Sequence, residues 1–320
     1  MKSVTGKRAI SGTETTHISS AQISSAYLGL HDSLCRSFQT EEPTRAFAAE
    51  VIEGPGNGIS CPNVLTDGVV FEKAAVLFTH AQGAELPAGA TCRRPHLAGH
   101  PFEAISVSVV AHPRNPYVPS AHLNVRVFLV KASPKQTSWW VGGGFDLTPF
   151  YPYKQDVIDW HRAARDACLP YGENLHHSFK QNCDTYFFLS HRKETRGAGG
   201  IFFDDHQQEG GLGESVELTL SVAEHFQTAY TAIVTRRKDT RYGERERKFQ
   251  SYRRARYAEF ILLYDRGTRY GLQSGRRVES VLACLPPVAE WIYQFTPEPD
   301  SPEARLVTDY FVPRDWLAAE

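Results

Sequence analysis

Polar side chains stand at every second position of the segment 122–126, where His122, Asn124 and Arg126 alternate with aliphatic residues. Such alternation predicts a β-strand with one apolar and one polar face. A histidine can transfer a proton, an amide can donate and accept hydrogen bonds, and a guanidinium can hold a carboxylate through two parallel bonds. This face is therefore either a site that handles an acidic ligand or the solvated face of an antiparallel sheet.

Three consecutive glycines at 142–144 precede Asp146. Glycine lets another group approach the backbone closely and tolerates a positive φ. Asp146 could form a turn through its side chain or act as a base in a pocket. Because no helix is predicted to follow, the glycines do not form a dinucleotide-binding loop.

Four histidines, His112, His122, His161 and His191, are spread over the middle of the chain. Imidazole is a common metal ligand, so together they could form a metal site. None of them belongs to an H-x-H or H-x-x-x-H pattern, and separate structural roles are the alternative. The acidic end of 199–205 could likewise bind a cation or simply end a strand.

The elements that must position these side chains form an α+β pattern. Because the strands follow one another without regular β-α-β alternation, we expect an antiparallel sheet with helices packed on it. Residues 1–20 are expected to be flexible and residues 21–320 to form one catalytic domain. The expected strands are 104–110, 122–129, 139–141, 200–203, 258–264 and 278–282, and the expected helices are 20–53, 154–168, 173–187, 214–237 and 243–256.

Charge and cysteine usage exclude several classes of protein. Thirty-five Lys and Arg balance 36 Asp and Glu, so no bulk field attracts nucleic acid. No apolar run reaches the ~20 residues that span a bilayer. Six cysteines occur without a C-x-x-C pair, which predicts reduced structural thiols and a cytoplasmic location.

The chain resembles the oxygen-dependent coproporphyrinogen III oxidase family through strings that occur in the family's order over residues 50–295. Collinear matches of this length are highly specific. They lie at 67–74, 107–110, 112–119, 122–126, 139–149, 191–197, 199–205, 253–260, 265–268 and 279–280.

This resemblance implies a large antiparallel sheet between two layers of helices, and a homodimer with its dimerisation region at about 257–285. It implies the oxidative decarboxylation of two propionates of coproporphyrinogen III to vinyl groups, which gives protoporphyrinogen IX in haem biosynthesis. Oxygen accepts the electrons, and no flavin, haem or nicotinamide takes part. A divalent metal ion is attributed to bacterial members.

The resemblance also implies roles for individual residues. His122 matches the proton donor, and Asp146 matches the carboxylate that engages the pyrrole N–H groups; with Arg126 they form the expected catalytic set. Arg126 and Arg277 are the candidates to hold the substrate's carboxylates. The implied substrate contacts are Ser108, Asn124, Val125, Arg126, Gly275, Arg276 and Arg277, and the implied metal ligands are His112, His122, His161 and His191.

The chain departs from the family pattern at several positions, and three of these departures change the chemistry of the side chain. Leu77 and Ile261 stand where the family has asparagine, and Arg276 stands where it has glycine. The chain is therefore either an ordinary coproporphyrinogen oxidase or a paralogue. Such a paralogue would oxidise or decarboxylate another carboxylated pyrrole or indole with the same cofactor-free oxygen chemistry. A non-catalytic tetrapyrrole-binding protein is the third hypothesis.

Overall fold

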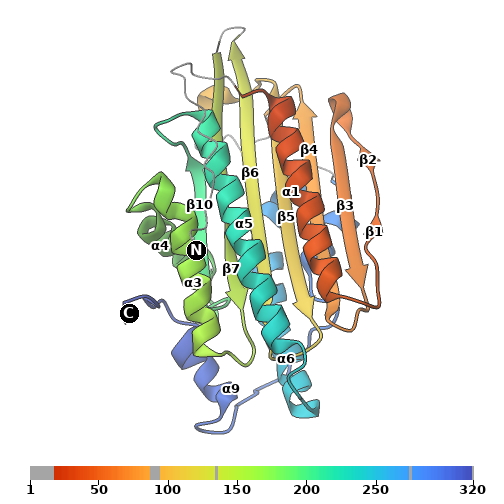
Figure 1. Ribbon diagram of the computed structural model, residues 1–320, viewed down its shortest axis with the longest axis vertical. Coiled ribbons are helices and arrows are strands. Elements are labelled where there is room, and N and C mark those ends of the chain that lie inside the picture. The colour runs from red at the N-terminus through yellow and green to blue at the C-terminus, as the bar shows by residue number, and fades with distance from the viewer. Residues whose placement is uncertain (1–17, 87–93, 134–135, 274–275, 319–320) are drawn as a thin grey trace, which may run out of the picture.

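A computed structural model describes residues 18–86, 94–133, 136–273 and 276–318, and its centre is a long antiparallel sheet (Figure 1). The strands follow the order β1-β3-β4-β5-β6-β7-β10, and β2 pairs with β3 at one edge. Their bounds are β1 (Ala48–Ala49), β2 (Ile52–Glu53), β3 (Ile59–Thr66), β4 (Phe71–Gly83), β5 (Phe102–Pro113), β6 (Ser120–Ser133), β7 (Gln136–Thr148) and β10 (Gly199–His206). A separate two-stranded sheet joins β8 (Phe188–Leu189) to β9 (Glu194–Thr195).

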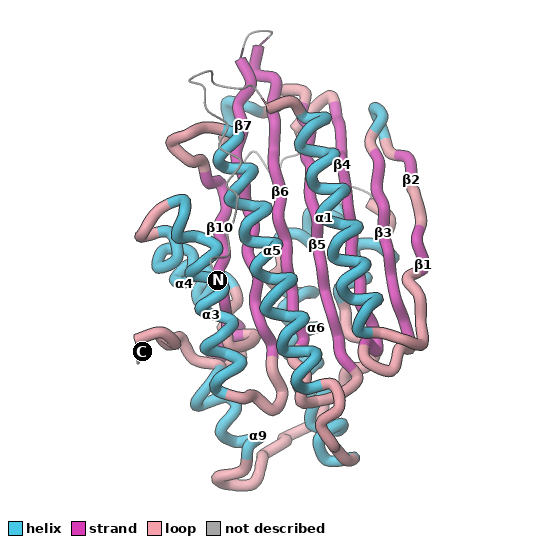
Figure 2. The backbone as a smooth tube through the Cα atoms, in the orientation of Figure 1, coloured by secondary structure: helices cyan, strands magenta, loops and turns pink. Residues whose placement is uncertain are grey.

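Helices cover both faces of this sheet, which confirms the expected α+β fold. Three of them, α1, α3 and α5, run along one face (Figures 1 and 2), and α6 packs on the other. None of the described helices is long and apolar enough to cross a membrane. The α-helices are α1 (Ser20–Glu41), α3 (Lys154–Cys168), α4 (Leu175–Tyr186), α5 (Leu212–Arg237), α6 (Glu244–Leu263), α7 (Arg266–Gln273), α8 (Val278–Val281) and α9 (Pro302–Arg305). Short 3₁₀ segments are η1 (Pro55–Asn57), η2 (Pro95–Leu97), η3 (Leu169–Tyr171) and η4 (Leu282–Cys284), and η5 (Leu306–Tyr310) is a π-helix.

The first helix illustrates how local sequence sets an element's bounds. Ser19 and Gln22 form a capping box that satisfies backbone N–H groups at the start of α1. The helix ends at Glu41, just before Pro43, because proline disfavours a helical conformation in the residue that precedes it. The expected helix over 20–53 was therefore too long. Most of the segment expected to be flexible, residues 1–17, lies outside the described residues.

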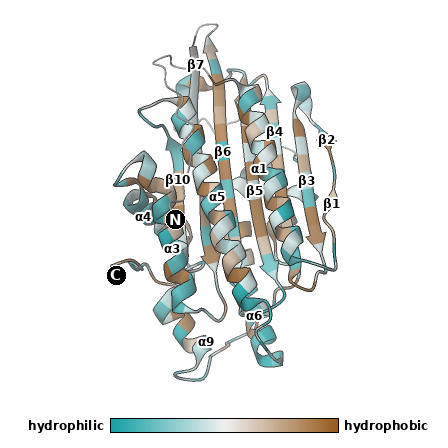
Figure 3. Ribbon diagram, viewed as in Figure 1, coloured by the Kyte–Doolittle hydropathy of each residue, from teal (hydrophilic) through white to brown (hydrophobic). Residues whose placement is uncertain are grey.

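The core lies between the sheet and the layer formed by α1, α3 and α5. Leu123, Val125 and Val127 of β6 are fully buried there and belong to a cluster that includes residues of α1 and α5. Figure 3 shows the same concentration of apolar residues along the central strands. The aliphatic half of the 122–129 alternation thus faces this core, and the polar half faces the opposite layer.

Two expected strands are wrong. Residues 258–264 continue α6 almost to their end, and residues 278–282 form α8 and the start of η4. The apolar residues Tyr257, Phe260 and Ile261 lie at helical spacing and pack against Val110 of the sheet. A short apolar run has the same composition in a buried strand and in a buried helical face, so periodicity could not separate the two.

Candidate active site

The candidate site begins with a cross-strand pair of His122 and Asp146. The register of β6 and β7 places these two residues directly opposite each other on the polar face. Their atoms Nδ1 and Oδ1 lie 2.9 Å apart, within hydrogen-bond distance. The side chain of His122 is 20% exposed and that of Asp146 only 2%. The histidine is therefore the member of the pair that a ligand can reach.

Arg196 binds the same carboxylate from behind. Its Nε and Nη2 atoms donate to the two oxygens of Asp146, at 3.1 and 2.6 Å. The guanidinium is buried against three aromatic rings, with its central carbon 4.1 Å from the ring centre of Phe187 and 4.7 and 4.6 Å from those of Tyr257 and Phe260. A bidentate pair within an aromatic cage has a single well-defined geometry.

Electrostatics keep Asp146 ionised despite its burial. Desolvation alone would favour the neutral acid, but the positive charge of Arg196 and the hydrogen bond to His122 outweigh it and lower the pKa of Asp146. In turn, the carboxylate raises the pKa of Arg196, although burial acts in the opposite direction. The site thus pairs a carboxylate whose pKa is lowered with a guanidinium whose pKa is raised.

A second ion pair lies further along the same strands. Arg126 donates to Oδ1 of Asn124 at 2.6 Å and to Oδ1 of Asp204 at 2.7 Å. Asp204 belongs to β10, so the Arg126 side chain crosses β7 to reach it. This path passes over Gly142, the register partner of Arg126, where any side chain would block it. Asp204 also pairs with Arg266, at 3.1 Å.

Glycines keep the polar face bare between the two ion pairs. Gly144 lies opposite Asn124 and has a φ of 137°, which few other residues adopt. A Cβ at this position would also strike the carbonyl group of Ile201 on the neighbouring strand. The glycine run therefore shapes the floor of the site, as the sequence indicated, and forms part of a strand instead of a phosphate-binding loop.

The expected substrate contacts divide between the two faces of the sheet. Ser108 lies directly opposite Asn124 in the register of β5 and β6, on the polar face and half-buried. The side chain of Val125 is fully buried in the core on the other face of the sheet. Only its backbone borders the polar face.

The two described residues of the expected substrate-binding turn, Arg276 and Arg277, have other partners in this structure. Arg277 pairs with Glu50 and Glu279, and Arg276 lies over the ring of Tyr270 at 5.3 Å from its centre. Among the described residues, neither arginine forms an ion pair with Asp146 or shares a partner with Arg126. Gly275 lies outside the described residues.

The four histidines have separate partners. His112 is fully buried between the hydroxyl of Ser120 and the carbonyl of Cys284, and His161 contacts the carbonyl of Ala198. His191 lies between Tyr264 and Glu259, and His122 contacts Asp146. Within the described part of the chain, no group of three or more histidine, cysteine or acidic side chains could hold a metal ion. The expected four-histidine metal site is therefore not assembled, and these residues do not fit the implied ion.

The acidic residues at the end of β10 and just before α7 pair with side chains or backbone groups of this chain. Besides the pairing of Asp204, Asp205 pairs with Arg94. Asp265 accepts bonds from the backbone and hydroxyl of Thr268 at the start of α7, and from Tyr186. Arg266, the next residue in the sequence, pairs with Asp204.

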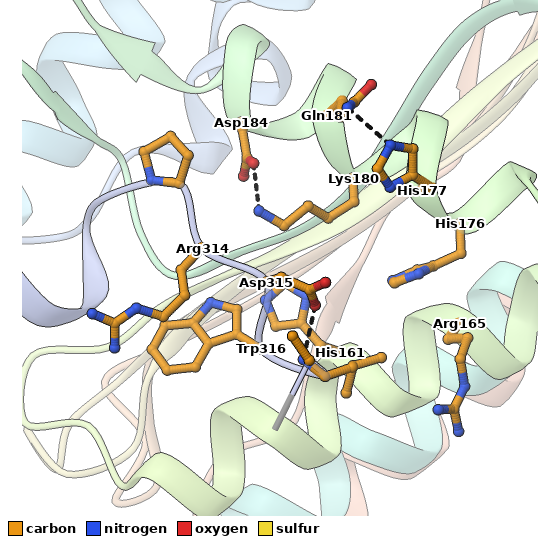
Figure 4. A pocket seen from close by; sticks show the side chains of 13 residues that line it. His161, Arg165, His176, His177, Lys180, Gln181, Asp184, Arg314, Asp315 and Trp316 are labelled. Carbon is orange, nitrogen blue, oxygen red and sulfur yellow. Dashed lines mark hydrogen bonds and ion pairs between the residues drawn. The ribbon is translucent and has the colours of Figure 1, made fainter. Parts of the chain in front are cut away.

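A separate pocket of about 430 Å³ lies between α3, α4 and residues 313–318 (Figure 4). His161 and Trp316 stack on one side of it, with ring centres 6.2 Å apart, and the Lys180–Asp184 ion pair lies on the other. His161 is the one residue of this pocket that was expected to be functional. None of the expected substrate contacts lines it.

Sequence reasoning missed Arg196. It occurs in the matched string 191–197, but nothing in its local pattern connects it to Asp146, which lies 50 positions away. The only available signal was indirect: a carboxylate on a buried strand needs a cation. That requirement does not identify which of the arginines provides it.

The chain matches a known protein family over most of its length. The family model described as coproporphyrinogen III oxidase matches residues 22–316. This range includes the sheet, both helical layers and every residue of the two ion pairs. The chain therefore belongs to the coproporphyrinogen III oxidase family.

Proposed function

We propose that this protein is an oxygen-dependent coproporphyrinogen III oxidase that converts two propionate side chains to vinyl groups. The observation that carries the proposal is the placement of the Arg196–Asp146–His122 chain and Arg126 on one face of the sheet, separated by glycines. The hypothesis requires Asp146 and a guanidinium to meet in one dry cavity, and it fails if they lie on opposite sides of the molecule or in bulk water with no recess between them. The common face of Asp146 and Arg126 supports the first part of this requirement, and the cavity between them remains part of the proposal.

Each proposed turnover has a simple balance. A propionate side chain loses its carboxyl group as CO₂ and one β-hydrogen, and a vinyl group remains. Dioxygen takes the two electrons and two protons and leaves as hydrogen peroxide. The electron-rich pyrrole can donate electrons to oxygen directly, so the proposal includes no organic cofactor.

The residues contribute binding and proton transfer to this reaction. Arg126 lies where it can exchange its bond to Asp204 for a bidentate bond to a substrate carboxylate. His122, supported by Asp146, can take up or deliver the proton that moves during vinyl formation. Arg196 is too deeply buried to contact a substrate.

One observation favours the paralogue as a second candidate. Leu77 lies opposite Ser108 in the register of β4 and β5, in the same row as Asn124. Neighbours in such a row are in contact across the strands, so an aliphatic side chain here changes the polarity next to two expected substrate contacts. The other departures carry less weight, because Ile261 is buried against the helices and Arg276 lies over Tyr270.

A direct assay separates the candidates. The purified protein is incubated aerobically with coproporphyrinogen III, and protoporphyrinogen IX, CO₂ and oxygen uptake are measured with and without a chelator. Two vinyl groups and two molecules of CO₂ per substrate support the oxidase. Much faster turnover of another carboxylated pyrrole or an indole acid would support the paralogue. Tight porphyrin binding without oxygen uptake would mark a non-catalytic binding protein.

A homodimer and a cytoplasmic location complete the proposal. Large apolar side chains are exposed near the expected dimerisation region, and a second copy would cover them: Leu262, Leu263, Leu272 and Val278 are 45–56% exposed. Tyr257, by contrast, is buried inside the chain and does not belong to that surface. The five described cysteines are free, as in proteins of a reducing compartment. Sedimentation of the wild type and of Leu263→Glu tests the dimer, which the variant should dissociate.

A further inference from the structure

Arg196 binds both oxygens of Asp146, and no role in the reaction is yet assigned to it. We propose that Arg196 is a positioning residue that reserves Asp146 for His122, so that His122 presents an unprotonated Nε2 to the substrate. The inference deepens the function proposed above and rests on it for the identity of the ligand. It also changes the role of Asp146, which was expected to receive the pyrrole N–H groups itself.

Packing holds the guanidinium of Arg196 beside Asp146. The guanidinium is 1% exposed and lies within 4.1–4.7 Å of the centres of three aromatic rings. The backbone N–H of Arg196 also donates to the carbonyl of Phe187, at 2.8 Å. Since a guanidinium keeps its charge in proteins, the anion beside it is preserved as well.

The contact with Asp146 determines which ring nitrogen of His122 carries the hydrogen. An ionised carboxylate only accepts hydrogen bonds, so the imidazole nitrogen that contacts Asp146 must be the donor. That nitrogen is Nδ1, at 2.9 Å from Oδ1. In a neutral ring the other nitrogen, Nε2, is then an acceptor. Among the described residues none forms a hydrogen bond with Nε2, and the side chain is partly exposed.

A ligand has little access to the carboxylate of Asp146. Its carboxylate is 2% exposed and receives two bonds from Arg196 and one from His122. A pyrrole N–H group would have to displace one of these donors to reach it. His122 is partly exposed at the same place and offers an acceptor without any rearrangement, so the ligand meets the histidine and Asp146 acts through it.

The tautomer of His122 tests the inference directly. Nitrogen-15 NMR of the histidine-labelled full chain at about pH 8, where an ordinary imidazole is neutral, distinguishes a protonated Nδ1 from a protonated Nε2. His122→Asn identifies the signal. We expect Nδ1–H in the wild type. In Asp146→Asn the amide can donate to Nδ1, and the ring should switch to Nε2–H.

Two variants of Arg196 connect the tautomer to turnover. Arg196→Met should leave His122 in a mixture of tautomers and lower kcat by about 10²–10³-fold, with KM changed less than about threefold. Arg196→Lys keeps the charge and should retain part of both properties. The matched control is Arg237→Met, because Arg237 forms a similar bidentate pair with Asp156 and lies over Tyr153. This control should leave the tautomer and kcat unchanged.

The possible outcomes are distinct. An Nε2–H ring in the wild type, or an unchanged tautomer and kcat in Arg196→Met, would overturn the inference. If Arg196→Met does not fold, Arg196→Lys and Asp146→Asn decide the question. Because the spectrum is recorded on the free protein, an Nδ1–H ring supports the inference even when coproporphyrinogen III is not turned over, and that second result would reject only the proposed substrate.

Discussion

The guanidinium of Arg126 occupies the space that a side chain at Gly142 would fill. A Cβ built on Gly142 would lie 2.6 Å from Nη2 and 2.8 Å from the central carbon of Arg126. These two residues are register partners on β6 and β7, so the absence of one side chain determines the path of the other. The position of the Arg126 guanidinium therefore depends on the glycine at position 142.

Gly142→Ala should displace Arg126 and weaken the binding of the acidic substrate. Because the guanidinium would lose its place between Asn124 and Asp204, we expect KM to rise about tenfold with a smaller change in kcat. Gly29→Ala is the matched control, since a Cβ at Gly29 of α1 meets nothing within 4 Å and should be neutral or slightly stabilising. Steady-state kinetics of both variants check this prediction, and an unchanged KM in Gly142→Ala would contradict it.

Arg126→Lys should raise KM more than it lowers kcat. Lysine retains the charge but cannot form two parallel bonds to a carboxylate, and about a 10- to 100-fold rise in KM is expected. Arg236→Lys is the control, because Arg236 pairs with Asp156 and Asp159 on the opposite face of the sheet. If Arg126→Lys lowered kcat alone, Arg126 would act in the chemical step and not in binding.

Tyr257→Phe should be neutral or stabilising. The hydroxyl of Tyr257 is buried without a hydrogen-bond partner in the described part of the chain, and its removal relieves an unsatisfied group. The matched control is Tyr230→Phe, whose lost bond from the hydroxyl to the carbonyl of Pro119 should cost about 1 kcal/mol. Thermal unfolding compares the two. A fall in kcat of tenfold or more in Tyr257→Phe would instead assign its hydroxyl to turnover.

The sequence predicted local features of this site well because they follow from strand geometry. Alternation placed His122, Asn124 and Arg126 on one face, and the glycine run indicated a close approach at Gly142. The partners across the molecule could not be predicted in the same way. Which acid or base lies opposite depends on the register of β6, β7 and β10, and that register is set by the packing of the entire sheet.

Packing across the molecule also explains why one expected strand is a helix. The strand expected at 258–264 belongs to α6, because the sheet offers this segment a surface that a helical face can cover. The role of Arg276 and Arg277 stays a prediction, since in this structure Arg277 pairs with Glu50 and Arg276 lies over the ring of Tyr270.

The carboxylate of Glu42, which lies outside the site, should contribute to the stability of the fold in acid. Glu42 is fully buried after α1, and its oxygens accept bonds from the N–H and hydroxyl of Thr44 and from the N–H groups of Val70 and Phe71, at 2.6–3.1 Å. Burial favours the neutral acid, but these hydrogen bonds outweigh it and lower the pKa of Glu42 from 4.5 to about 2. The folded state therefore binds this proton less readily than the unfolded state does.

The sign of the pH effect follows from that shift. The stabilisation is fully present above about pH 4.5 and is lost as the pH falls towards 2. Glu42→Gln should lower the free energy of unfolding by about 1–3 kcal/mol at pH 7, because an amide cannot accept all four bonds. It should also flatten the decline of stability between pH 4.5 and 2. Urea unfolding across this range, with the exposed Glu173→Gln as control, measures both effects. An equally steep decline in Glu42→Gln would show that other carboxylates govern the acid stability of the fold.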